Sequence, residues 1–114
     1  MIFCSKNEKG EYSWRLVLDG RKTVTRRLKS IPVGKIRAVQ PLRGRKAVGY
    51  IKIISCQSHN GWFVGLPTGN KQFTDEAEKE GFYSWHGLLD WFADHKIKIF
   101  DTYRMEFELV NKDV

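Results

Sequence analysis

The strongest pattern in the sequence is an alternation of apolar and charged residues near the C-terminus. Over residues 102–110, four apolar side chains alternate with three charged ones: Tyr103, Met105, Phe107 and Leu109 with Arg104, Glu106 and Glu108. A period of two puts the two sets on opposite faces of an extended chain, which predicts a half-buried β-strand. Residues 47–56 are rich in Val, Ile and Tyr and predict a second strand.

Three shorter segments are also apolar or β-branched enough to predict strands, and they cover residues 1–5, 23–28 and 36–40. Polar or glycine-rich stretches between the elements predict loops, at residues 6–11, 41–46 and 57–73. The last of these is long enough to include one short strand.

The first helical pattern lies near the N-terminus. Residues 12–19 carry Trp14, Val17 and Leu18 on one side, which predicts one or two turns of helix. Gly20 follows directly and can take the left-handed backbone that ends a helix.

Two more helices are predicted in the acidic C-terminal half. Thr74 is a candidate N-cap for a helix over residues 75–80, because acidic side chains follow it at the positive end of the helix dipole, and Gly81 would close that helix. Ser84 would cap the next helix, whose apolar residues recur with helical spacing at Trp85, Leu88, Leu89 and Phe92.

Together these elements predict an α+β fold in one domain, residues 1–114. We expect a small twisted sheet or partly closed barrel, with helices plugging one end or covering one face. The acid-rich helices and the acid-free sheet segment would then form opposite walls of one cleft.

Charge is distributed very unevenly along the chain. The formal net charge is +7, and the segment from Gly20 to Thr74 holds 12 basic residues and no acidic one. The remaining segments hold 8 basic and 13 acidic residues. A polyanionic partner such as RNA explains this division, because cations neutralise phosphates and release their counterions. A continuous solvated basic surface is the alternative.

Other features narrow the class of protein. No apolar run approaches the roughly 20 residues of a membrane-spanning helix, and the N-terminus lacks a signal-peptide pattern. Cys4 and Cys56 are therefore expected to be reduced, buried thiols of a cytoplasmic protein. The three histidines have no metal-ligand spacing, so we expect no metal. We also expect no cofactor and no membrane partner. A monomer is favoured.

The cationic run Gly20–Arg27 is the best candidate for chemistry, since it holds four cations and two hydroxyls. The neighbouring arginines lower the pKa of Lys22, which makes this lysine usable as a base. A base could take the proton of the Thr25 hydroxyl and turn it into a nucleophile. An acid from residues 75–80 could move a proton or orient a substrate. Sequence spacing alone does not bring such an acid to Lys22.

The same run resembles the signature of the ASCH domain (activating signal cointegrator homology), a relative of the PUA RNA-binding fold. Further stretches are similar to small stand-alone ASCH proteins of bacteria and phages, at residues 34–40, 47–51, 76–82 and 106–110. The resemblance covers nearly the whole chain. It implies a PUA-like mixed β-barrel of about five or six strands, two to three flanking helices, and a basic cleft for RNA or a modified nucleoside.

One branch of this family is an amidohydrolase that removes the acetyl group from acetylated cytidine nucleosides with a lysine, a threonine and a glutamate. The resemblance places these catalytic groups on Lys22, Thr25 and Glu80. Lys22 would act as general base, Thr25 as nucleophile, and Glu80 would help to protonate the leaving amine. Arg26 and Arg27 are strand neighbours, so one should enter the cleft and one should reach solvent, and the resemblance favours Arg27 as the group that stabilises the oxyanion.

The other cations are expected to contact the ligand, those of the loop 41–46 through its phosphates. The full set of expected ligand-binding residues is Arg21, Arg26, Arg27, Arg43, Arg45 and Lys46. The loop 41–46 and the glycine-rich stretch 57–70 depart from the amidohydrolase branch. Three functions therefore stay open: hydrolysis of an acylated cytidine, RNA binding without catalysis, and cleavage of single-stranded RNA.

Overall fold

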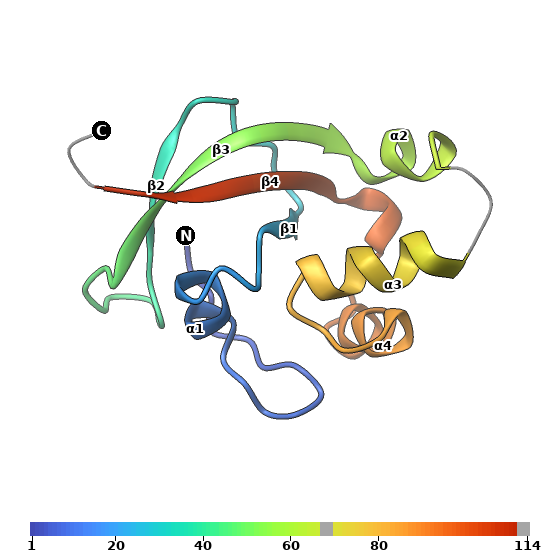
Figure 1. Ribbon diagram of the computed structural model, residues 1–114, viewed down its shortest axis with the longest axis horizontal. Coiled ribbons are helices and arrows are strands. Elements are labelled where there is room, and N and C mark those ends of the chain that lie inside the picture. The colour runs from blue at the N-terminus through green and yellow to red at the C-terminus, as the bar shows by residue number, and fades with distance from the viewer. Residues whose placement is uncertain (67–69, 112–114) are drawn as a thin grey trace.

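The computed structural model describes residues 1–66 and 70–111. The elements follow the order α1 (Ser13–Leu18), β1 (Val24–Arg27), β2 (Ile36–Val39), β3 (Gly49–Ser58), α2 (His59–Val64), α3 (Asn70–Lys79), α4 (Trp85–Asp94), a short 3-10 helix η1 (Ile99–Asp101) and β4 (Tyr103–Val110). Each helix and strand is labelled, space permitting, in Figure 1. In the part of the chain described, no helix is long and apolar enough to cross a membrane.

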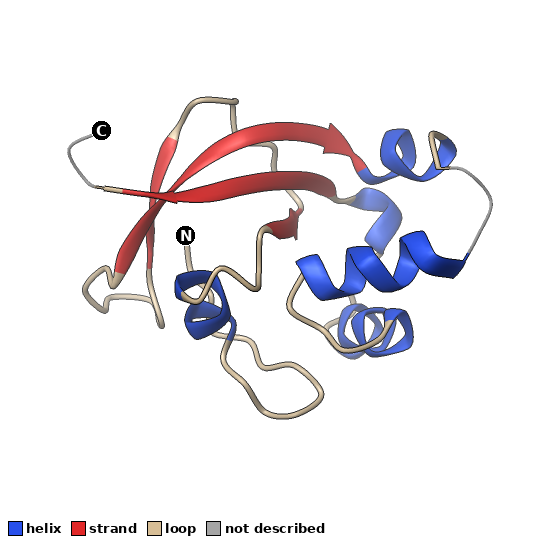
Figure 2. Ribbon diagram, viewed as in Figure 1, coloured by secondary structure: helices blue, strands red, loops and turns tan. Residues whose placement is uncertain are grey.

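The strands form one antiparallel sheet in the order β1-β4-β3-β2. The long strands β3 and β4 lie side by side and curve along the molecule. Helices α2, α3 and α4 gather at the end of the sheet where β3 finishes and β4 begins (Figure 2). This curled sheet with flanking helices confirms the predicted α+β, PUA-like fold.

One face of the sheet and α1 enclose the main apolar core. Its buried residues are Phe3, Val17, Val39, Ile51, Ile53, Met105 and Phe107. A second buried group joins α4 to η1 through Leu88, Phe92 and Ile99. Each buried side chain of this size contributes about 1.5–3 kcal/mol to folding, so the two groups fix α1 and α4 at their places around the sheet.

Within the described residues the sheet has four strands, fewer than the five or six expected. The predicted strand at residues 1–5 is not formed, because Ile2 makes only a single bridge to Gln40. The Phe3 amide donates to the Gln40 carbonyl at 2.9 Å, and the Phe3 carbonyl accepts from the Trp14 amide at 3.1 Å. The N-terminal segment is thus held between the end of β2 and α1, without a ladder on either side.

The loop predicted at residues 57–73 is largely helical, apart from residues 67–69, which lie outside the described part. The Ser58 hydroxyl caps α2 by accepting from the Gly61 amide at 3.0 Å. Trp62 lies 6.0 Å from Trp85, between ring centroids, and Phe73 lies 4.9 Å from Trp85. This aromatic packing overrides the local glycine content. It also extends α3 past the predicted start, so the expected N-cap at Thr74 is wrong.

The other predicted helix ends are confirmed. The Ser84 hydroxyl accepts from the Gly87 amide at 2.9 Å and caps α4. Gly20 and Gly81 both have a positive φ, of 77° and 91°, just after α1 and α3. A Cβ on Gly81 would lie 3.0 Å from Leu16 Cδ1 and 3.6 Å from Lys22 Cβ, so the turn after α3 packs directly on Lys22.

Candidate active site

A cavity of about 320 Å³ opens between β1, the N-terminal segment, the turn after α3, and α4. Its lining includes charged and hydroxyl groups: Lys22, Thr25, Arg26, Arg27, Glu80 and Thr102. It also includes apolar residues of α4 and its neighbours: Phe82, Leu88, Trp91, Phe92 and Ile97. The expected basic cleft is therefore lined by apolar as well as by basic residues. Arg26 and Arg27 of β1 and Glu80, just after α3, line the same cavity.

Lys22 is buried at the base of this cavity, just before β1. Its ammonium donates to the Val24 carbonyl at 2.9 Å and to the Glu80 carbonyl at 2.7 Å. Its Nζ also lies 3.6 Å from Glu80 Oε1. Burial lowers the pKa of Lys22; the Glu80 carboxylate opposes this and Arg27 adds to it. A neutral amine keeps two hydrogens for the two carbonyls, and its lone pair is then free to accept a proton.

Thr25 and Arg27 lie on the same strand and contact each other. The Arg27 Nε donates to Thr25 Oγ1 at 3.3 Å, and Arg27 Nη2 donates to the Ile2 carbonyl at 2.8 Å. Burial lowers the pKa of Arg27. Because the Thr25 oxygen accepts from Arg27, its own hydrogen is available to an acceptor in the cavity.

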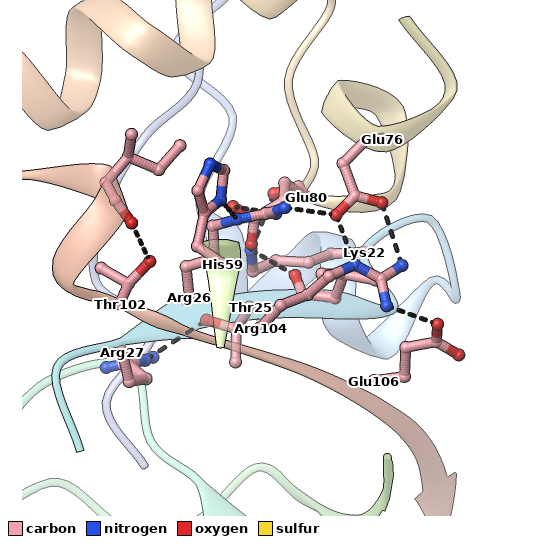
Figure 3. Close-up of polar contacts among 12 residues, drawn as sticks. Lys22, Thr25, Arg26, Arg27, His59, Glu76, Glu80, Thr102, Arg104 and Glu106 are labelled. Atoms are coloured by element: carbon pink, nitrogen blue, oxygen red, sulfur yellow. Dashed lines mark hydrogen bonds and ion pairs between the residues drawn. The ribbon is translucent and has the colours of Figure 1, made fainter. Parts of the chain in front are cut away.

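The Arg26 side chain is completely buried, with 0% of its surface exposed. Its Nε donates to His59 Nδ1 at 3.0 Å, Nη2 lies 2.7 Å from Glu76 Oε2, and Nη1 lies 3.5 Å from Glu80 Oε2. Figure 3 shows the Arg26 side chain among these partners from α2 and α3. The expectation that one of the two arginines reaches solvent is wrong for Arg26, because partners distant in sequence hold it in the interior. Arg27 lines the cavity and is partly buried.

Glu76 joins this group to β4. It accepts from Arg104 through both oxygens, with Arg104 Nη2 3.0 Å from Glu76 Oε1. Burial would raise the pKa of Glu76, but Arg104 and Arg26 outweigh it and lower the pKa below its usual value. Burial, reinforced by Arg26, lowers the pKa of His59 to about 4. At neutral pH the group holds neutral His59 and an ionised carboxylate between two guanidinium groups.

The expected ligand-binding cations divide into two sets. Arg26 and Arg27 line the cavity, whereas Arg21 lies outside it on the surface, 2.9 Å from Glu11 and 2.8 Å from the Tyr83 hydroxyl. The three remaining cations, Arg43, Arg45 and Lys46, are exposed in the loop between β2 and β3 and do not line the cavity.

Several residues of the site were not predicted. Glu76 could have been found from its spacing of four from Glu80, which puts both carboxylates on one helix face. Arg104 lies on the charged side of the closing strand, which was expected to face solvent. His59 and Trp91 give no signal in the sequence. Cys4, expected to be buried, is exposed and lines the cavity, and both cysteines are free.

Across residues 1–66 and 70–111, no group of three or more His, Cys, Asp or Glu side chains is arranged to hold a metal ion.

Two solved structures have folds similar to this one. An ASCH domain from Lactobacillus crispatus JV V101 has a TM-score of 0.56 and 19% identity, covering 94% of this chain and 76% of that chain. A DUF984 protein from Enterococcus faecalis V583 has a TM-score of 0.50 and 17% identity, and the match covers 85% of this chain and 69% of that chain. No family model and no curated protein matches the sequence.

Proposed function

We propose that this chain, which has an ASCH-type fold, hydrolyses the amide bond of a small neutral substrate of the acylated cytidine class. The observation that carries the proposal is the meeting of Lys22, Thr25 and Glu80 in one cavity, with Lys22 Nζ 3.6 Å from Glu80 Oε1. A base, a hydroxyl and a carboxylate around one hollow are the groups that acyl transfer requires.

In the first step, neutral Lys22 takes the proton of the Thr25 hydroxyl while Thr25 Oγ1 attacks the amide carbonyl carbon. The new C–O bond gives a tetrahedral oxyanion. Arg27 already donates to Thr25 Oγ1, so its guanidinium is close to the reacting atoms and can stabilise this charge.

In the second step, the oxyanion collapses and the C–N bond breaks. The leaving amine receives the proton that Lys22 carries, and Glu80 beside it orients this transfer. Thr25 then holds the acyl group as an ester. Water, deprotonated by Lys22, hydrolyses the ester, releases the carboxylic acid and restores the Thr25 hydroxyl.

The composition of the cavity supports a substrate without charge. Phe82, Trp91 and Phe92 form an apolar part of the cavity wall. A phosphate placed against that wall would lose its hydration without gaining hydrogen bonds. A planar uncharged group, such as a nucleobase or an acyl chain, gains from contact with these rings.

A second candidate function is RNA binding without catalysis. It is favoured by the exposed cations Arg43, Arg45 and Lys46, which lie outside the cavity and are open to a phosphate backbone. This surface is compatible with hydrolysis in the cavity, so each activity needs its own assay.

The protein should be incubated with N4-acetylcytidine and, in parallel, titrated with labelled single-stranded RNA at increasing salt. Release of cytidine and acetate, with a Michaelis constant that is nearly independent of salt, is the expected result. RNA affinity that falls steeply with salt, without turnover, would favour the second candidate. Shortened RNA would instead point to a ribonuclease. No turnover and no binding would overturn both proposals.

A further inference from the structure

The Glu80 carboxylate lies between two cations and is hydrogen-bonded to neither. Its Oε1 is 3.6 Å from Lys22 Nζ, and its Oε2 is 3.5 Å from Arg26 Nη1. The side chain is 3% exposed, and no donor among the described residues is hydrogen-bonded to the buried Oε1. A charged oxygen left in this state costs free energy, so the surroundings must hold it there.

Neither cation is free to close the gap. Lys22 is tied to the main-chain carbonyls of Val24 and Glu80 by bonds of 2.9 and 2.7 Å. Arg26 is held by three other groups: the Glu76 carboxylate, His59 Nδ1 and the ring of Trp62, whose centroid lies 4.6 Å from the guanidinium carbon. Arg26, Lys22 and Glu80 are drawn close together in Figure 3.

The position of Glu80 between two cations affects the pKa of Lys22, and therefore its use as a base. A carboxylate in close contact with one lysine stabilises the ammonium form and raises its pKa. A carboxylate shared with a second cation raises the lysine pKa less, because the positive charge of that cation offsets part of the carboxylate's negative potential at the lysine. Around Lys22 the facing charged groups are Glu80 from the turn after α3 and Arg26 and Arg27 from β1. Behind Arg26 lie Glu76 from α3, Arg104 and Glu106 from β4, and neutral His59 from α2.

We propose that Arg26 is a positioning residue: it holds Glu80 midway between itself and Lys22, so that the carboxylate does not clamp the ammonium and Lys22 can lose its proton. Glu76 and His59 set the place of Arg26. This inference deepens the proposed function, since it explains how Lys22 can serve as a base, but the geometry on which it rests is independent of any substrate.

The test is an NMR titration of Lys22 in the full chain, labelled with ¹³C and ¹⁵N in lysine and assigned with Lys22→Met. Arg26→Gln frees Glu80 to pair with Lys22 alone, so the Lys22 midpoint should rise by about one pH unit or more. Arg26→Gln leaves the buried Glu76 carboxylate with one cation fewer. The double variant Arg26→Gln/Glu76→Gln removes that carboxylate as well, and the Lys22 midpoint should also rise in it.

Glu76→Gln alone should act in the opposite direction. Arg26 then has Glu80 as its remaining carboxylate and draws it away from Lys22, so the midpoint should fall. Glu106→Gln is the matched control. It removes the other carboxylate that is bonded to Arg104. The Glu106 side chain is 39% exposed, so its loss should leave the Lys22 midpoint unchanged.

Opposite shifts would support control of the Lys22 midpoint by the Arg26 and Glu76 charges around Glu80, since loss of packing alone would not reverse sign. Equal midpoints in all variants, or shifts of one sign, would overturn it. The titration needs no turnover, so it separates this inference from the proposed function. If amides are hydrolysed, the acid limb of kcat/KM should move in the same direction as the Lys22 midpoint, with KM little changed.

Discussion

The Lys22 ammonium and the Glu80 carboxylate face each other at 3.6 Å although the two residues are 58 positions apart. Main-chain contacts set this relationship. The Thr23 amide donates to the Lys79 carbonyl at 2.8 Å, and the Lys22 ammonium donates to the Glu80 carbonyl at 2.7 Å. The C-terminus of α3 is thus docked on the residues that enter β1, and the two side chains meet because the backbones do.

The first prediction concerns the Thr25 hydroxyl. Thr25→Val keeps the shape of a buried side chain that is 4% exposed but removes the nucleophile. We expect amide hydrolysis to fall on the order of 10³-fold or more, and Thr25→Ser to keep measurable activity. Steady-state kinetics with N4-acetylcytidine, together with circular dichroism, provides the measurement.

Thr23→Val is the control for this change, because Thr23 is two residues away and does not line the cavity. It should keep near-normal turnover. Full activity in Thr25→Val would exclude Thr25 as the nucleophile, whatever the control does.

The second prediction concerns stability in mild acid. The pKa of His59 is about 4 in the folded chain and near its usual 6.5 in the unfolded chain, so the unfolded state binds more protons between these values. Stability is therefore fully present above pH 6.5 and falls as the pH decreases toward 4. We expect a loss of about 1 kcal/mol per pH unit in urea unfolding between pH 6 and 5.

His59→Asn should flatten this dependence, since Asn can accept from Arg26 Nε but does not titrate. Glu76, whose pKa is lowered, adds a further loss only below its ordinary 4.5. An unchanged slope in His59→Asn would show that another group causes the acid sensitivity.

The third prediction concerns the turn after α3. Gly81→Ala must keep a φ of 91° and place a methyl group 3.0 Å from Leu16 Cδ1. Gly44→Ala is the matched change, because Gly44 also has a positive φ but nothing lies within 4 Å of an added Cβ. We expect about 1 kcal/mol from the backbone conformation at each site and about 1 kcal/mol more at Gly81. Equal losses in chemical denaturation would contradict the close packing on Leu16 and Lys22.

The fourth prediction separates the two candidate functions. Replacing Arg43, Arg45 and Lys46 together by Gln removes three exposed cations outside the cavity. RNA affinity should fall, and the slope of log affinity against log salt should become shallower by about 2, since each lost phosphate contact contributes about 0.7. Amide hydrolysis should not change. A lost amide activity with intact RNA binding would contradict this division of the surface.

Much of the fold could be predicted from local patterns. The helix near the N-terminus ends just before Gly20, Ser84 caps α4, and the alternating residues near the C-terminus form a strand. These features depend on neighbours within a few residues, through backbone conformation, capping and the spacing of apolar side chains. The helix at His59–Val64 could not be predicted in this way, because distant aromatic side chains outweigh its glycine, Gly61.

The same division holds for the candidate site. By itself, the sequence determined the identity of the cationic run, the hydroxyl at Thr25 and the acidic helix that carries Glu80, because composition and short-range periodicity are local. Only the tertiary structure decided that Glu80 meets Lys22, that Arg26 is buried against Glu76 and His59, and that loop cations lie elsewhere. Those contacts join segments far apart in the chain, and they form because packing of the helices against the sheet closes long loops at once.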